Sequence, residues 1–372
     1  MMNSNNKVLR RDEGLTLGLM RLYESFGYKK FKMRKFEKYD LYLENKTFLR
    51  NANIITVTDP AGHLLALKPD ITLSIVKNIL AASLPLKLYY NENIYFGDTN
   101  AAEIKETTQV GLEYIGDIDV RSLAEILLLA AESLDRADGN YRIAISHMGI
   151  VSEILDSLNV SESIKETIYS LISDKNLHGI KQICSNLSFS EDVTEKICNL
   201  VTVSGRFSTA IKDAEKLVGG EVSKSSLKEL EELSKIIDSF GLSDKFILDF
   251  SVMNDVSYYN GIVFQGFICG IPKFVLSGGR YDNLVRRFGC DTSAAGFAIS
   301  VDLIKEYQYR EQEFDYDVLL SYSNECDPAL VLKLQREIVE NGESCIALST
   351  DAEWLKCKRR VIVTPDGSMK NE

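Results

Sequence analysis

Short turns, rather than long helices, join most of the strand-like segments in this sequence. Such segments occur at 87–96, 106–116, 246–253, 261–268, 273–277 and 294–301. Antiparallel strands can be joined by a tight turn, whereas parallel strands need a crossover of a dozen or more residues. The sequence therefore predicts an α+β chain built on a largely antiparallel sheet.

Helical patterns and one hairpin accompany these strands. Segment 13–26 carries leucines on one helical face, and Gly27 follows as a terminator. Segment 123–134 is a strongly apolar helix for which Asp119 is the expected N-cap. Segment 53–70 predicts a hairpin, because its DPAG turn places proline second and glycine fourth. Helices are thus expected to flank the sheet.

Two changes of pattern indicate the domain organisation. Residues 147–240 have helical spacing and interrupt the strands, so they predict a helical insertion. From Asp315 onwards a strand–helix–strand pattern of about 55 residues begins, near the lower size limit for an independent domain. The expected division is a core at 1–312 and a small α/β unit at 313–372.

Composition limits the function classes. A net charge of −11 argues against a nucleic-acid partner, since proteins that bind nucleic acids need basic residues to displace phosphate counterions. No apolar run approaches the roughly 20 residues that span a bilayer, and the polar N-terminus lacks a secretion signal. Scattered cysteines and three dispersed histidines argue against a metal site. We expect a cytoplasmic protein without metal, cofactor or membrane contact.

Three stretches together resemble the catalytic core of histidyl-tRNA synthetases. They are "LALKPDIT" at 65–72, "TTQVGLEYIG" at 107–116, and a run at 257–300 that contains "YYNG", "SGGRYDNL" and "GFAIS" in that order. The resemblance covers about residues 10–305. It implies a class II aminoacyl-tRNA synthetase-like fold, in which helices flank an antiparallel sheet that carries an amino-acid pocket, and it implies a dimer.

The resemblance also implies which residues form this pocket. Acceptor carboxylates suit the ammonium of a free amino acid, and tyrosine hydroxyls suit an imidazole. Paired glycines would let the backbone approach the ligand closely. The expected pocket residues are Asp70, Thr72, Gln109, Glu113, Tyr258, Tyr259, Gly278, Gly279 and Tyr281.

Each of these residues also has a structural interpretation. Asp70 follows a proline and could cap a helix. Gln109 and Glu113 alternate along a strand and could face water. The tyrosines could pack in the core with their hydroxyls bonded to backbone, and the glycines could serve only a turn. Both sets of interpretations stay open at this point.

Three arginines that synthetases of this family use for adenylation have no counterpart here. Their positions fall on Tyr95, Asn254 and Leu303. Losing one preorganised donor to a developing oxyanion costs about 2.7–4 kcal/mol, so losing three would slow adenylation by orders of magnitude. Lys68 and Arg280 remain, but a lysine cannot reproduce the bidentate fork of an arginine. We expect no catalytic residues.

A synthetase-like core without adenylation chemistry resembles the regulatory subunits of ATP phosphoribosyltransferase. That resemblance implies a short-form catalytic subunit as partner, a dimer within a hetero-oligomer, and histidine feedback in histidine biosynthesis with free histidine as a ligand. Two alternatives remain. One is a divergent histidyl-tRNA ligase, and the other is a stand-alone amino-acid-binding synthetase paralogue.

Overall fold

The computed structural model describes residues 11–45, 53–78, 84–98, 103–253, 258–308, 314–349, 352 and 354–371. The chain divides into a larger unit, Arg11–Lys305, and a smaller unit that includes Glu306–Glu372. The domain boundary predicted at 312–313 lies outside the described residues. Each unit has its own hydrophobic core.

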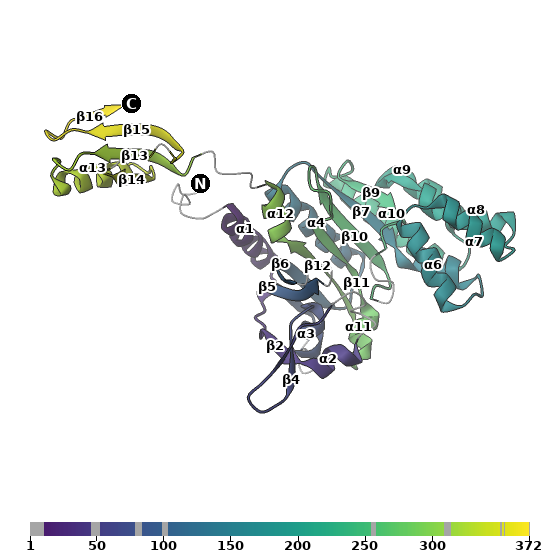
Figure 1. Ribbon diagram of the computed structural model, residues 1–372. Helices are drawn as coiled ribbons and strands as arrows, with labels where there is room; N and C mark the ends of the chain where they lie inside the picture. The colour runs from purple at the N-terminus through teal and green to yellow at the C-terminus, as the bar shows by residue number, and fades with distance from the viewer. Residues whose placement is uncertain are drawn as a thin grey trace. The chain divides into compact units, whose positions relative to one another are not determined.

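A nine-stranded sheet forms the centre of the larger unit (Figure 1). Its strand order is β1 (Lys29–Lys30), β5 (Leu86–Asp98), β6 (Glu103–Gly116), β12 (Ser293–Ser300), β11 (Leu276–Arg280), β10 (Ile262–Ile268), β7 (Tyr141–His147), β9 (Phe246–Asp249) and β8 (Ser204–Arg206). Only the β1–β5 and β7–β9 pairs are parallel. The prediction of a largely antiparallel sheet is therefore confirmed.

Two predicted strands differ from the observed ones. The strand expected at 246–253 ends at Asp249, because the Asp249 carboxylate accepts hydrogen bonds from both the backbone and the hydroxyl of Ser251. Such a local side-chain bond competes with strand pairing and starts a turn. The strand expected at 273–277 lies instead at Leu276–Arg280, where it pairs with β10 and β12.

Different helices cover the two faces of the sheet. One face packs against α1 (Arg11–Ser25) and α4 (Val120–Ala137), and the other packs against α3 (Thr72–Asn78) and α11 (Asp282–Arg287). Asp119 caps α4, because its side chain accepts from the Ser122 backbone N–H, as predicted. Because successive side chains of a strand point to opposite faces of the sheet, the strands contribute side chains to two separate cores.

A three-stranded sheet lies beside α2 (Tyr39–Glu44) and contributes to the second core. Its order is β2 (Phe36–Lys38), β4 (Leu64–Leu67) and β3 (Thr56–Thr58). β3 and β4 form the predicted hairpin, and Gly62 adopts the left-handed conformation (φ 87°) that its turn requires. The hairpin therefore leads directly into the segment that carries Asp70 and α3.

The helical insertion follows β7. It comprises α5 (Met148–Asp156), α6 (Glu162–Ser173), α7 (Leu177–Asn186), α8 (Glu191–Thr202), α9 (Phe207–Ala214), a 3₁₀ turn at Glu215–Leu217 and α10 (Glu221–Ser239). Figure 1 shows α6, α7 and α8 clustered at the end of the unit that carries β7 and β9. The insertion also supplies β8, which pairs with β9 and so extends the sheet.

In the described part of the smaller unit, a four-stranded sheet packs with the helix α13 (Pro328–Glu340). The strands run in the order β14 (Cys345–Leu348), β13 (Tyr316–Tyr322), β15 (Cys357–Val363) and β16 (Met369–Asn371), with α13 after β13. β13 pairs in parallel with both β14 and β15, so the predicted strand–helix–strand pattern is confirmed. β16 was not predicted, because three exposed polar or flexible residues carry little strand signal.

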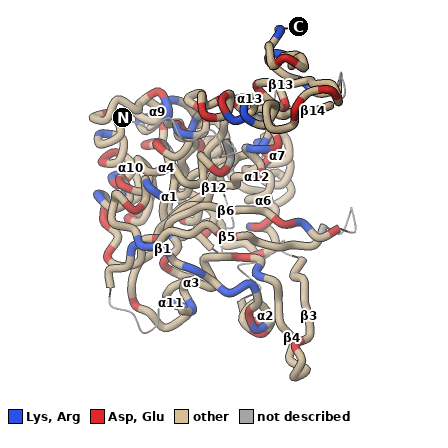
Figure 2. Tube along the Cα trace, turned by 90° about the vertical axis from the view of Figure 1, so that its left-hand side faces the viewer, with Lys and Arg blue, Asp and Glu red and all other residues tan. Residues whose placement is uncertain are grey.

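A basic segment runs from β1 to β2. Six of the ten residues at 29–38 are lysine or arginine, all six are exposed, and Glu37 is the only acidic residue among them. Figure 2 shows this concentration of positive charge beside β1, whereas both signs alternate over much of the remaining trace. Because β1 is an edge strand, its lysines disfavour pairing with the edge of another chain.

No helix within the described residues combines the length and the apolar character that crossing a bilayer requires.

We expect Gly278→Ala to lower the free energy of unfolding by about 1–3 kcal/mol, the usual cost of overpacking a core. A Cβ at Gly278 would lie 2.5 Å from Phe297 Cβ and 2.7 Å from the Phe264 ring. Gly18→Ala in α1 is the control, because nothing lies within 4 Å of its Cβ position. It should stabilise by about 0.5–1 kcal/mol. Urea unfolding followed by circular dichroism measures both, and equal stability of Gly278→Ala and wild type would contradict the packing argument.

Candidate functional site

A cavity of about 320 Å³ lies on the sheet face that α3 and α11 cover. Strand alternation explains why polar side chains reach it from the sheet. On β6, Gln109 and Glu113 point to this face, whereas Val110 and Leu112 between them point to the opposite core. The β6 sequence therefore supplies polar groups to one face and apolar groups to the other.

The structure brings seven of the nine predicted pocket residues together around this cavity. Five elements or loops contribute them, and the residues are Asp70, Thr72, Gln109, Glu113, Tyr258, Tyr259 and Tyr281. The remaining lining residues are Ile71, Tyr90, Phe274, Ser277, Gly296, Phe297 and Ala298. Sequence reasoning missed these seven. The strand alternation would have indicated Tyr90, which lies opposite Gly111 on the cavity face.

Gly278 and Gly279 do not line the cavity. Both lie within β11, so they do not form a turn. Gly278 makes room for Phe264 and Phe297 in the core on the opposite face. A Cβ at Gly279 would lie 2.6 Å from the Tyr259 ring, so this glycine allows a cavity-lining side chain to pack against the sheet.

Glu113 is the most deeply buried polar residue of the cavity, with 2% of its surface exposed. Its Oε1 accepts from the Thr72 hydroxyl at 2.7 Å, and its Oε2 accepts from the Tyr281 hydroxyl at 2.5 Å. Burial raises the pKa of Glu113 to about 8 despite these two hydrogen bonds. The alternative that Glu113 faces water is therefore wrong.

Asp70 has two roles in the structure. Its Oδ1 accepts from the Leu73 backbone N–H at 2.7 Å, as the helix-cap interpretation predicted. Its side chain also lines the cavity, and burial raises its pKa to about 6. The structural and the pocket interpretations of Asp70 are thus compatible.

Three tyrosines form an aromatic wall of the cavity. The ring centroids of Tyr258 and Tyr259 are 4.8 Å apart, and those of Tyr258 and Tyr281 are 5.6 Å apart. Tyr258 and Tyr281 belong to the core that also contains α3 and α11, so packing fixes their rings. The wall offers aromatic surface together with hydroxyl groups, a combination that suits a polar aromatic ligand.

No lysine or arginine stands among the described residues that line this cavity. Asp70 and Glu113, whose pKa values are both raised, interact with each other in this cavity and have no cation in its lining. Such a site gains most from a ligand that brings its own positive charge, because a buried carboxylate needs a cationic or hydrogen-bonding partner.

The two cations that the sequence retains near this site are both paired. Lys68 is 1% exposed, and its Nζ lies 2.8 Å from Glu92 Oε2. Arg280 donates from Nε to Asp282 Oδ2 at 2.9 Å and from Nη2 to the Ser293 hydroxyl at 3.1 Å. Both side chains therefore have structural partners.

The positions of the missing arginines have other contacts. The Tyr95 hydroxyl donates to Glu106 Oε1 at 2.9 Å, and Leu303 packs against the larger core. Asn254 lies outside the described residues. Asp302 Oδ2 accepts from the Thr108 backbone N–H at 2.6 Å, which ties the start of α12 (Val301–Gln308) to β6.

Within the described residues, no group of three or more histidine, cysteine, aspartate or glutamate side chains could hold a metal ion. The contacts of His147 are structural. Its Nδ1 accepts from the Gly149 backbone N–H at 3.1 Å and caps α5, and its Nε2 lies 3.0 Å from Glu229 Oε1.

Comparison with known proteins gives two informative similarities in sequence. The sequence model described as histidyl-tRNA synthetase matches residues 5–304. An ATP phosphoribosyltransferase regulatory subunit from Caldanaerobacter subterraneus subsp. tengcongensis is 30% identical over 335 residues, which cover 86% of this chain and 86% of that protein. The expected class II synthetase-like fold agrees with both.

Solved structures have the same fold. One from Bacillus halodurans, described as an ATP phosphoribosyltransferase regulatory subunit/histidyl-tRNA synthetase, has a TM-score of 0.80 and 25% identity, with 95% of this chain and 94% of that chain covered. A chain of the ATP phosphoribosyl transferase (HisG:HisZ) complex from Thermotoga maritima has a TM-score of 0.61 and 17% identity, with 77% and 96% covered. The latter shows the fold alone. The predicted fold class is confirmed.

Proposed function

The chain belongs to the histidyl-tRNA synthetase family and, within it, to the ATP phosphoribosyltransferase regulatory subunits, and from this premise we propose how it works. It assembles with the short catalytic subunit of ATP phosphoribosyltransferase, as a dimer within a hetero-oligomer, and activates that subunit. It takes part in histidine feedback and has no transferase or synthetase activity of its own. It works in the cytoplasm, and its net charge of −11 argues against a nucleic-acid partner.

One observation supports the ligand part of this proposal. The buried Glu113 and the partly buried Asp70 both face a cavity whose described lining contains no cation. The α-ammonium of free histidine would bind Glu113 and Asp70, and its imidazole would lie against the tyrosine wall. Adenylate formation needs cations at the α-phosphate, and Lys68 and Arg280 are already paired with Glu92 and Asp282. The site therefore suits binding of an amino acid without its activation.

Binding and assembly should be linked by a reciprocal coupling free energy. We expect saturating catalytic subunit to change the affinity for histidine by about 5- to 150-fold, the range of typical allosteric couplings. Saturating histidine must then change the affinity between the subunits by the same factor, because linkage is symmetric. Titration calorimetry of each pair, with and without the third component, measures both factors. No change in either affinity would argue against this mechanism.

Glu113→Gln should weaken histidine binding by about 10- to 100-fold, since a hydrogen bond to a charged group contributes roughly 1.5–3 kcal/mol. Binding at pH 7 should also release a proton in the wild-type chain, because Glu113 has a pKa near 8 and must ionise to hold an ammonium. Calorimetry in buffers of different ionisation enthalpy detects this release, which Glu113→Gln should abolish. Glu106→Gln is the control, because Glu106 lies on the same strand but outside the cavity. Unchanged affinity and proton release in Glu113→Gln would remove Glu113 from the ligand site.

The main alternative is a divergent histidyl-tRNA ligase, because the sequence model that matches residues 5–304 is described as histidyl-tRNA synthetase. It requires ATP–pyrophosphate exchange that depends on histidine, and our proposal expects none above background. A stand-alone amino-acid-binding paralogue would bind histidine without capturing the short catalytic subunit. Exchange and co-purification assays together therefore separate the three functions.

A further inference from the structure

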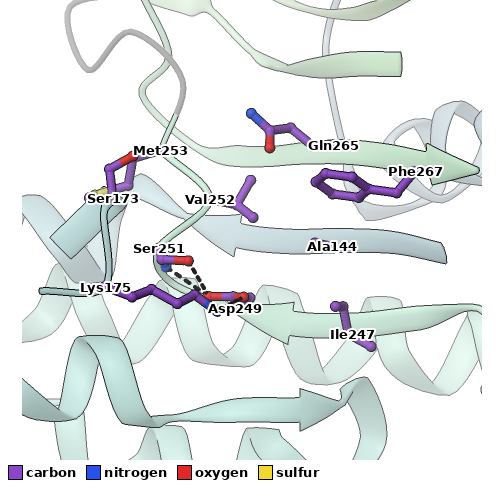
Figure 3. A pocket seen from close by; sticks show the side chains of 10 residues that line it. All are labelled: Ala144, Ser173, Lys175, Ile247, Asp249, Ser251, Val252, Met253, Gln265 and Phe267. Atoms are coloured by element: carbon purple, nitrogen blue, oxygen red, sulfur yellow. Dashed lines mark hydrogen bonds and ion pairs between the residues drawn. The ribbon is translucent and has the colours of Figure 1, made fainter. Parts of the chain in front are cut away.

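A second cavity, of about 350 Å³, lies on the same face of the nine-stranded sheet (Figure 3). The register places both cavities on one face, because Gln265 of the second pairs directly with Ser277 of the first. Ala144 and Ile247 continue this row across β7 and β9 to form the floor. The second cavity is therefore separate from the first but close to it.

The polar end of this cavity is built around Asp249, which is 7% exposed. Its Oδ1 accepts from the Ser251 backbone N–H at 3.0 Å and from the Ser251 hydroxyl at 2.6 Å. Its Oδ2 accepts from Lys175 Nζ at 2.6 Å. Figure 3 shows these groups at one end, with the side chains of Val252 and Phe267 farther along. The cavity thus combines a buried anion with apolar walls.

The cation that pairs with Asp249 comes from a distant and exposed part of the chain. Lys175 lies in the turn between α6 and α7, 74 residues from Asp249, and 49% of its side chain is exposed. Its backbone is left-handed (φ 52°), a conformation that glycine adopts without cost at the end of a helix. Lys175 therefore adopts a strained backbone conformation, and its ammonium donates to the buried carboxylate of Asp249.

We propose that this cavity binds a small organic amine with an apolar body, whose ammonium replaces that of Lys175 at Asp249. A ligand cation can take this place without leaving Asp249 unpaired, and the displaced lysine is exposed enough to be solvated. An anionic ligand would place a second negative charge beside the buried Asp249 carboxylate, with Lys175 as the one cation among the described lining residues. The side chains of Ile247, Val252 and Phe267 provide apolar surface for the rest of the ligand.

Occupancy of the cavity would also act on the helical insertion. The Lys175–Asp249 ion pair joins the α6–α7 turn to strand β9. A bound amine breaks this connection, so the turn should open more often and its backbone N–H groups should exchange faster. Binding of an amine at this site should therefore increase the backbone mobility of the α6–α7 turn, whether or not histidine occupies the first cavity.

The test uses 2-phenylethylamine as the probe and 3-phenylpropionate as its anionic counterpart, in NMR titrations of the full chain. All variants are made in a chain that carries Glu113→Gln, which we call the parent. This substitution should weaken amine binding at the first cavity. Lys175→Gly should bind the amine at least tenfold more tightly than the parent, and Asp249→Asn should bind at least tenfold more weakly. Ser188→Gly is the matched control, because Ser188 is also left-handed (φ 55°) but does not line the cavity.

Hydrogen exchange at residues 174–177 should accelerate when the amine is added to the parent, but not when 3-phenylpropionate is added. Equal amine affinity in the parent, Lys175→Gly and Ser188→Gly would overturn the proposal, as would equal binding of the acid and the amine. In either case the cavity is only a gap closed by an ion pair. If Asp249→Asn does not fold, the glycine variant and the acid still decide the question.

Discussion

Between pH 5 and pH 8.5, the free energy of unfolding should fall by about 4 kcal/mol more in the wild-type chain than in Glu113→Gln. Burial raises the pKa of Glu113 from 4.5 to about 8. Below pH 4.5 the carboxyl is protonated in both states and does not affect stability. As the pH rises towards 8, the unfolded chain loses this proton while the folded chain keeps it. Stability therefore falls by about 1.4 kcal/mol per pH unit until the folded chain ionises as well.

Urea unfolding of both proteins at the two pH values measures this difference. Circular dichroism reports mainly on the larger unit, which contains most of the helical residues. Contributions from titrating groups that do not interact with Glu113 are common to both proteins and cancel. A stability difference that is equal at pH 5 and pH 8.5 would mean that Glu113 has an ordinary pKa.

The same carboxylate explains why a binding site can be costly for the fold. A neutral glutamine at 113 would remove the burial penalty, yet it would also remove the anion that holds an ammonium. A ligand that brings positive charge offsets the penalty, so histidine should stabilise the larger unit most at alkaline pH. Stability and binding at this site therefore oppose each other, as is usual for functional sites.

Local sequence signals predicted much of the fold. The DPAG turn, the Asp119 cap and the leucine spacing of α1 each depend on residues within a few positions of one another. Signals of this kind survive in a single sequence because local geometry determines them. The sequence missed β1, β2, β7, β8 and β16. Four of these strands have only two or three residues each, whereas β7 is a buried strand of seven residues whose partners, β10 and β9, lie far along the chain.

The candidate site depended on a different kind of information. Asp70, Glu113 and Tyr281 are separated by tens of residues or more, and spacing alone cannot show that they meet. The resemblance to a known family predicted that these residues meet. In the structure, Glu113 accepts hydrogen bonds from Thr72 and Tyr281. The same resemblance could not predict the second cavity, because the Lys175–Asp249 pair joins a turn of the insertion to a strand end.

Lys68→Met should lower the free energy of unfolding by about 3–5 kcal/mol, the usual cost of breaking a buried ion pair. Lys68 is 1% exposed, and its Nζ lies 2.8 Å from Glu92 Oε2. Glu92 Oε1 also accepts from the Met33 backbone N–H at 3.2 Å, so its carboxylate, which is 16% exposed, is held in place and would be left without a cation. The loss should follow mainly from that unpaired charge.

The double variant Lys68→Met/Glu92→Gln tests this cause. It removes both charges and keeps an oxygen that can accept from Met33, so its stability should return to within about 1 kcal/mol of wild type. Lys224→Met, which breaks an exposed pair with Glu221, should cost no more than about 0.5 kcal/mol. Equal losses in the single and double variants would mean that Lys68 stabilises by packing instead. Recovery in the double variant would show that the lysine at this position serves the carboxylate of Glu92, which leaves no cation here for a nucleotide phosphate.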